Sequence, residues 1–226
     1  MALALSATVW AQSTPEKRAL ITQRIDEAEL VALPGNVHRA VRAATDRGAV
    51  AADTMLNHMY LQLNRAPEVL QAAEELAMRL RDPNSPQFHH WLTLDEIGER
   101  FGPADEDVHT VSRWLASHGL IVNFIYPANG LVDFSGSAGA VRDAFHTEMH
   151  SLLSNGRTHV ANVSDPLIPA ALAPAIRGIV YLHDFRPRPV MRHRPRPYAQ
   201  RRARLIFTFN RGSMPEPLRG GRPAGS

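Results

Sequence analysis

The sequence predicts an α+β fold, in which an antiparallel sheet carries helices packed on one face. Three observations support this prediction. Segments with strand and helix periodicity follow one another as strand, helices, hairpin, helix, hairpin and strand between residues 53 and 185. Two of the intervening turns have the composition of hairpin turns, which join antiparallel neighbours. Hydrophobic residues make up 44% of the 226-residue chain, enough for one buried core.

The first elements lie between residues 15 and 82. We expect a short helix at 15–30 and a turn at 33–36 (LPGN). Residues 54–64 (TMLNHMYLQLN) alternate in polarity and predict a half-buried strand, with one face formed by Met55, Asn57, Met59, Leu61 and Leu63. Residues 66–82 predict a helix with an apolar stripe that comprises Val69, Leu70, Ala73, Leu76, Ala77 and Leu80.

Two further helices follow. Thr93 and Glu96 have the spacing of a capping box, so a helix is expected to begin at Thr93 and to end at Gly102-Pro103. A longer helix is expected at 104–118, closed by Gly119. Its predicted buried residues are Val108, Val111, Trp114 and Leu115.

The second half of the domain predicts two hairpins around a helix. Strands at 120–126 and 131–136 flank the turn PANG, and a second hairpin at 148–162 turns at Asn155-Gly156. Between them, Ser137 is expected to cap a helix over 137–146. A short helical turn and an apolar strand at 179–182 complete the domain.

The first residues, MALALSATVWAQS, indicate export. Residues 1–11 resemble the end of a signal peptide, with small residues placed for cleavage between Ala11 and Gln12, although the basic start is missing. An unstructured apolar N-terminus is the alternative. Residues 12–32 form a polar segment, and no other run approaches the roughly 18 apolar residues of a membrane span. A secreted or periplasmic location without membrane contact is therefore expected.

Basic residues concentrate at the other end of the chain. Residues 186–226 hold 11 of the 25 basic residues and one of the 22 acids, in a Pro/Arg-rich sequence that predicts a linker and a disordered tail. Such a tail can bind phosphate backbones, but it lacks lysine and offers few aromatic rings for base stacking. A basic linker is the favoured interpretation, and nucleic-acid binding stays an alternative.

The sequence offers little for chemistry. No cysteine is present, which excludes disulfides, thiolate zinc sites and a cysteine nucleophile. The neighbours His89 and His90 do not share a face, and the other histidines lack metal-ligand spacing. The glycines around Ser135 and Ser137 are out of frame for a nucleophile elbow. Residues 81–103 are therefore interpreted as a helix stop, a proline-directed turn, an aromatic anchor and a helix start.

The run DPNSPQFHHWLTLDEIGERFGP, followed by VHTVSRWLASHGLIV, resembles the activation propeptide of the sedolisin family of serine-carboxyl peptidases, the pro-kumamolisin type. The resemblance continues through DFSGSAGAVRDAFHTEMHSL to residue 190. The matching motif residues, to which we assign structural roles, are Asp82, Pro83, Ser85, Pro86, Phe88, His89, Trp91, Leu92, Thr93, Phe101, Gly102, Pro103, Trp114, Leu115, Gly119 and Gly136.

The resemblance implies a prodomain at 33–185 with a fold similar to the prodomains of subtilisin-type proteases. It implies that the domain assists folding of a sedolisin-type catalytic domain, blocks its cleft and is released in acid. Ten of the eleven histidines and 21 of the 22 acids lie in residues 1–185, so acid would change the charge of this region strongly. The partner's catalytic residues and calcium site would lie outside this sequence, so no cofactor and no enzyme activity are expected for the chain itself.

The linker is the expected site of activation cleavage, with candidate positions at Arg192, Arg194, Arg196, Arg201, Arg202 and Arg204. A truncated or frameshifted zymogen is the expected origin of the chain, and a monomer its expected state. A free-standing protease inhibitor remains the main alternative.

Overall fold

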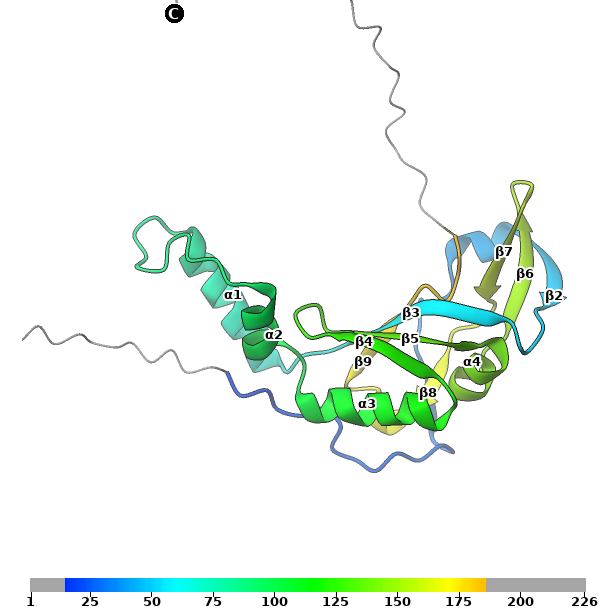
Figure 1. The fold of residues 1–226 in the computed structure, drawn as a ribbon, viewed down its shortest axis with the longest axis horizontal. Coiled ribbons are helices and arrows are strands. Elements are labelled where there is room, and N and C mark those ends of the chain that lie inside the picture. Colours follow the sequence, from blue (N-terminus) through cyan, green and yellow to red (C-terminus); the bar gives the residue numbers. More distant parts are fainter. Residues whose placement is uncertain (1–14, 186–226) are drawn as a thin grey trace, which may run out of the picture. The chain divides into compact units, whose positions relative to one another are not determined.

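The computed structural model describes residues 15–185, in which all paired strands are antiparallel (Figure 1). A four-stranded sheet has the order β4-β5-β3-β9, and a three-stranded sheet has the order β2-β6-β7. A short pair joins β1 to β8. The strands are β1 (Leu30–Ala32), β2 (Thr45–Ala49), β3 (Met55–Leu63), β4 (Ile121–Tyr126), β5 (Leu131–Ser137), β6 (Met149–Ser154), β7 (Arg157–Asn162), β8 (Leu167–Pro169) and β9 (Ile176–Val180).

The helices confirm the predicted α+β class. They are α1 (Pro67–Arg81), α2 (Leu94–Phe101), α3 (Asp105–Ser117) and α4 (Ala138–Phe145), with 3-10 turns η1 (Arg39–Ala43) and η2 (Ala170–Leu172). Among residues 15–185, none of these helices is long and apolar enough to cross a membrane. The predicted signal cleavage site between Ala11 and Gln12, and the tail from residue 186 on, lie outside the described residues.

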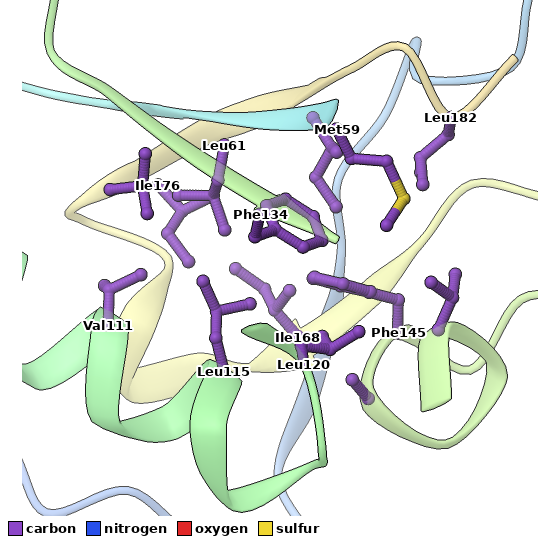
Figure 2. Packing of buried hydrophobic residues seen from close by; sticks show 14 of the residues in the cluster. Met59, Leu61, Val111, Leu115, Leu120, Phe134, Phe145, Ile168, Ile176 and Leu182 are labelled. Carbon is purple, nitrogen blue, oxygen red and sulfur yellow. The ribbon is translucent and has the colours of Figure 1, made fainter. Parts of the chain in front are cut away.

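The main core lies between one face of the four-stranded sheet and the helices α3 and α4. Figure 2 shows Leu61 and Phe134 of the sheet pointing toward Leu115 of α3 and Phe145 of α4. The rings of Phe134 and Phe145 lie 5.8 Å apart, within the range of favourable aromatic pairs. This layer is the predicted sheet with helices on one face.

Helices α1 and α2 pack mainly on each other. Their smaller core is made by Ala66, Val69, Leu76, Leu80 and Phe101. Leu70, predicted for the buried stripe of α1, is instead exposed. Helix α2 touches the four-stranded sheet at the β4–β5 turn. The approach at Gly98 is so close that a Cβ atom there would lie 2.9 Å from Pro127 Cβ. We call α1, α2 and the loop between them the helical arm.

The predicted helix at 15–30 is wrong. Residues 15–29 contain no helix, and the backbone N–H groups of Leu20 and Ile21 donate to the buried carboxylate of Asp107 on α3, at 2.8 and 2.9 Å. Ile21 and Ile25 pack against the main core. The segment therefore satisfies its backbone through a distant helix, which the local sequence does not reveal.

Two strand predictions need adjustment. The last strand spans Ile176–Val180, three residues earlier at its start than the predicted 179–182. In β3, Met59, Leu61 and Leu63 are buried as predicted, but Met55 is exposed. The pairing of β3 with β5 shifts register between Leu56 and Met59, and this bulge breaks the alternation on which the prediction of a buried Met55 relied.

Candidate protein-docking surface

The outer face of the four-stranded sheet carries a row of side chains that crosses all four strands. Phe124 of β4 lies opposite Asp133 of β5, Asp133 lies opposite Tyr60 of β3, and Tyr60 lies opposite Val180 of β9. Because directly paired residues project to the same side of a sheet, these four side chains share one face. That face is opposite to the one covered by α3 and α4.

Aromatic rings contact one another along this face. The Tyr60 ring lies 5.8 Å from Tyr181 in an edge-to-face arrangement and 6.5 Å from Tyr126. Tyr126 in turn lies 4.7 Å from Phe124. Phe124 remains 58% exposed, and Tyr126 and Tyr181 are also exposed. We call Tyr60, Phe124, Tyr126 and Tyr181 the aromatic face.

A buried polar network lies beside these rings. The Asp133 carboxylate accepts a hydrogen bond from Asn123 Nδ2 at 2.8 Å and contacts His58 Nδ1 at 3.0 Å. Ser135 Oγ accepts from Asn123 Nδ2 at 2.8 Å and from the His58 backbone N–H at 3.1 Å. Asp133 and Ser135 are therefore buried on the outer side of the sheet with several partners each.

Two β-bulges make this network fit. One register shift lies in β3 between Leu56 and Met59, and the other lies in β4 between Val122 and Phe124, so the bulges flank the same part of β5. His58 adopts a positive φ of 57°, which is unusual for a residue with a side chain. The bulges direct His58 and Asn123 toward Asp133 from both neighbouring strands.

The electrostatics of the aromatic face keep its central ring neutral. Burial of the Tyr60 phenol, followed by the nearby Asp133 carboxylate, raises the pKa of Tyr60 above its ordinary value. His58 is the accessible member of the polar network, with 66% of its side chain exposed against 4% for Asp133. A group docking on this surface therefore meets the neutral Tyr60 phenol and, in the polar network beside the rings, the exposed His58 imidazole.

The geometry does not assemble a serine nucleophile with a base. Ser135 Oγ contacts the His58 backbone N–H and the Asn123 amide, whereas the His58 ring faces Asp133. Ser137 caps α4, as predicted, by accepting from Ala140 N at 3.1 Å. Within residues 15–185, no group of three or more histidine or acidic side chains lies close enough to hold a metal ion.

The motif residues singled out in the sequence lie mainly in the helical arm, where their contacts are structural. Asp82 ends α1 and accepts from Asn84 N, and Ser85 Oγ accepts from Gln87 N, so Pro83 and Pro86 lie within a hydrogen-bonded loop. Thr93 and Glu96 form the predicted capping box. Leu92 and Phe101 belong to the arm's apolar cluster, and a Cβ at Gly102 would collide with the carbonyl of Gly98.

The remaining motif residues hold the arm and α3 to the sheet. Pro103 lies near Gly130 of the β4–β5 turn, and Trp114 is buried with its indole N–H donating to Glu27 at 3.0 Å. Gly119 has a φ of 74°, as the predicted helix end requires. A Cβ at Gly136 would collide with Leu120.

The expected aromatic anchor is wrong for Trp91. This residue is 62% exposed, and its ring stacks 5.7 Å from His89, which stacks 3.7 Å from Phe88. His89 has a φ of 59°, so the chain reverses there. The arm's small apolar cluster contains Leu92 but does not enclose the indole.

The aromatic face was not among the residues selected from the sequence. The alternation of 54–64 points out the side of the strand that faces the core, whereas Tyr60 lies on the other side. The signal was present: Tyr60, Phe124 and Tyr126 lie in segments predicted as strands. Their convergence depends on strand order and register, which local periodicity does not supply.

Comparison with known proteins supplies the family. Residues 42–185 match the family described as "Pro-kumamolisin, activation domain". The chain belongs to this family. The matched range includes the four-stranded sheet with its aromatic face and the whole helical arm. The match lies within the predicted prodomain at 33–185, whose bounds stay a prediction.

Several peptidases are similar to this activation domain. Human tripeptidyl-peptidase 1 is 30% identical over 139 residues, which cover 57% of this chain and 23% of that protein. Xanthomonalisin from Xanthomonas sp. (strain T-22) is 28% identical over 132 residues, 53% of this chain and 16% of that protein. Sedolisin from Pseudomonas sp. (strain 101) is 27% identical over 111 residues, 49% and 19% respectively. The chain thus spans less than a quarter of the length of these relatives.

Proposed function

We propose that this activation domain docks through its aromatic face on the catalytic domain of a sedolisin-type serine peptidase, assists its folding and blocks its cleft until acid releases it. The observation that carries the proposal is the aromatic face on the outer side of the four-stranded sheet, where Phe124, Tyr126 and Tyr181 are exposed. The family supplies the class of partner.

The aromatic face has the properties of a protein interface. Tyrosine and phenylalanine combine a large apolar area with few rotatable bonds, and such residues are enriched at interfaces and at their energetic centres. The ring contacts between neighbouring aromatic residues restrict their rotation before any partner arrives. Docking would then order few additional side chains, which lowers the entropic cost of association.

The polar network supports the same role. Asn123 and His58 hold Asp133 on both sides, so the strands beneath the aromatic rings are cross-linked by hydrogen bonds. A surface held in one geometry favours a partner with a matching shape. His58 is exposed, so a docked partner would cover its imidazole and remove it from water.

The chain after residue 185 has a part in this proposal. We infer that the basic linker crosses the partner's cleft and is cut during activation, with Arg192, Arg194, Arg196, Arg201, Arg202 and Arg204 as candidate positions. The precursor is proposed to be exported, so that release takes place in an acidic space outside the cytoplasm. Protonation of acids would break ion pairs between the domains, and protonation of histidines would add positive charge to the activation domain.

An inhibition assay tests the proposal. The full chain is added to the mature forms of xanthomonalisin, sedolisin and tripeptidyl-peptidase 1. The inhibition constant is then measured near neutral pH and at about pH 4. We expect inhibition of at least one peptidase near neutral pH and weaker inhibition at about pH 4. Removing the rings with Tyr60→Ala and Phe124→Ala should raise the inhibition constant by about tenfold or more.

The matched control is Met78→Ala, which removes an exposed apolar side chain from the helical arm. This variant should inhibit as the parent chain does. Equal inhibition by all variants, or no inhibition of any of the three peptidases, would refute docking through the aromatic face. Recovery of the chain after incubation with the peptidase in acid distinguishes the two roles. A propeptide is degraded by the peptidase, whereas a lasting inhibitor stays intact.

A further inference from the structure

The last described residues of the domain are held against the end of β7. The backbone N–H of Asn162 donates to the carbonyl of Leu182 at 3.1 Å, and the N–H of Asp184 donates to the carbonyl of Val160 at 3.1 Å. His183 forms an isolated antiparallel bridge with Ala161. Residues 182–185 therefore form an added piece of strand beside β7, with few backbone bonds to hold it.

Aromatic rings supply the remaining contacts of this segment. The Phe185 ring stacks on His38 at 4.9 Å and on His159 at 4.3 Å. His183 lies 4.5 Å from His38 and 6.0 Å from Phe185. We call His38, His159, His183 and Phe185 the ring cluster. Three of its four members can be protonated.

The surroundings of His38 and His183 favour the neutral form of both rings. His38 Nδ1 accepts from the Ala40 N–H at 3.3 Å, where it caps η1, and a proton on this nitrogen would abolish the cap. His183 Nδ1 is buried with no hydrogen-bond partner among residues 15–185, so a proton there would place a charged donor without an acceptor. Two protonated rings 4.5 Å apart would also repel each other.

The neighbouring charges agree with this assignment. Burial, then the nearby Arg39 and His159, lowers the pKa of His38 below its ordinary value. Burial and His38 lower the pKa of His183, and Asp184 opposes them only in part. Tyr181 is a further titratable group beside the cluster, with its ring 6.4 Å from His183.

We propose that the ring cluster is an acid-released latch, which holds residues 182–185 against β7 at neutral pH and frees them when His38 and His183 are protonated. The proposal concerns the chain alone and does not depend on the proposed partner. While it is closed, the latch fixes the point at which the chain leaves the domain toward the basic segment that begins at residue 186.

The pH dependence has a defined direction. For a histidine whose pKa is lower in the folded state, the stabilisation is complete above the unfolded value of about 6.5 and is lost as pH falls toward the folded pKa. His159 does not open the latch, because its Nδ1 lies 2.8 Å from the Asp184 carboxylate, an acceptor that suits the imidazole ring. The release therefore depends on His38 and His183.

Hydrogen exchange of single amides in the full chain, followed by nuclear magnetic resonance, tests the latch. The readout is the protection factor of the Asp184 amide, corrected for intrinsic exchange, at pH 7.5 and pH 5.0. We expect a fall of about tenfold or more at the lower pH. The Leu61 amide in the core strand β3 serves as internal reference and should keep its protection.

The double variant His38→Phe with His183→Phe keeps the rings and removes both titrating groups. Its Asp184 protection should no longer fall between pH 7.5 and pH 5.0, whereas His109→Phe, on the exposed side of α3, should behave as the parent chain does. The latch is refuted if Asp184 protection in the parent chain is the same at both pH values, or if Leu61 loses protection by the same factor. If the double variant does not fold, these two readings on the parent chain decide.

Discussion

The two faces of the four-stranded sheet differ although they are made by the same strands. On the inner face, Leu61 and Phe134 are fully buried against α3 and α4. On the outer face, Tyr60 and Asp133 occupy the next positions along β3 and β5 and belong to an aromatic row that ends in the exposed Phe124. The inner face finds its partner within the domain. The outer face crosses the same strands, but within residues 15–185 no layer of helices covers it.

The comparison shows that two kinds of packing are encoded in alternate positions of a strand. The inner side chains are aliphatic or phenylalanine and interlock with helices, so their contribution is to folding. The outer side chains include three tyrosines beside a hydrogen-bonded carboxylate, a combination that tolerates water and still offers apolar area. Such a sheet keeps one face for its own core and leaves the other available to a partner.

The largest expected effect comes from the inner face. Phe134→Ala removes a fully buried ring that packs on Phe145, and should lower the free energy of unfolding by about 3–5 kcal/mol through lost apolar burial and the remaining cavity. Denaturant unfolding of the full chain measures this loss. A change below about 1 kcal/mol would show that the inner face is not the principal core.

An intermediate effect is expected between the two faces, at the polar network. Asp133→Ala leaves the Asn123 amide and the His58 ring without their common acceptor, and should lower the free energy of unfolding by about 1–3 kcal/mol. Asp133→Asn keeps one acceptor oxygen and should cost less. Equal losses for the two variants, again from denaturant unfolding, would contradict this role of the carboxylate.

The smallest effect on stability is expected on the outer face. Phe124→Ala removes a ring that is mostly exposed, so the free energy of unfolding should change by no more than about 0.5 kcal/mol. The same unfolding curves give this value. A loss comparable to that of Phe134→Ala would mean that Phe124 belongs to the folding core, and the contrast between the faces would disappear.

His150 in the three-stranded sheet gives a prediction about the pH dependence of stability. Burial alone would lower the pKa of His150, but hydrogen bonds that its ring donates to the carboxylates of Asp46 and Glu148 outweigh burial and raise the pKa. This contribution to stability is complete below the unfolded value of about 6.5 and is lost as pH rises through the folded pKa. His150→Gln should therefore destabilise the chain more at pH 5 than at pH 8, as measured by thermal unfolding. The reverse order would contradict the ion pairing of His150.

Local features of the fold were predictable from the sequence because their causes are local. The turn at Asn155-Gly156 has the positive φ values of 51° and 74° that its composition demands. The capping box of Thr93 and the cap of Ser137 form as predicted. In each case the residues that form the contact lie within three positions of one another.

Features that depend on distant contacts were not predictable. The pairing of β1 with β8 brings Leu30 opposite Pro169, and both strands have only three residues, too few for a periodic signal. Asp107 looks like an ordinary acid of a helix first turn, yet it binds the backbone of Leu20 and Ile21. The aromatic face was not predictable for the same reason, because it forms only when the four strands have their order and register.

Site-directed labelling tests the central claim most directly, because the chain has no cysteine of its own. The Phe124→Cys thiol on the aromatic face and the His109→Cys thiol on α3 are labelled with a thiol reagent, with and without an excess of an inhibited sedolisin-type catalytic domain. The account predicts that the catalytic domain slows labelling at position 124 strongly and leaves position 109 unchanged. Labelling at position 124 that proceeds equally fast in the complex would contradict it.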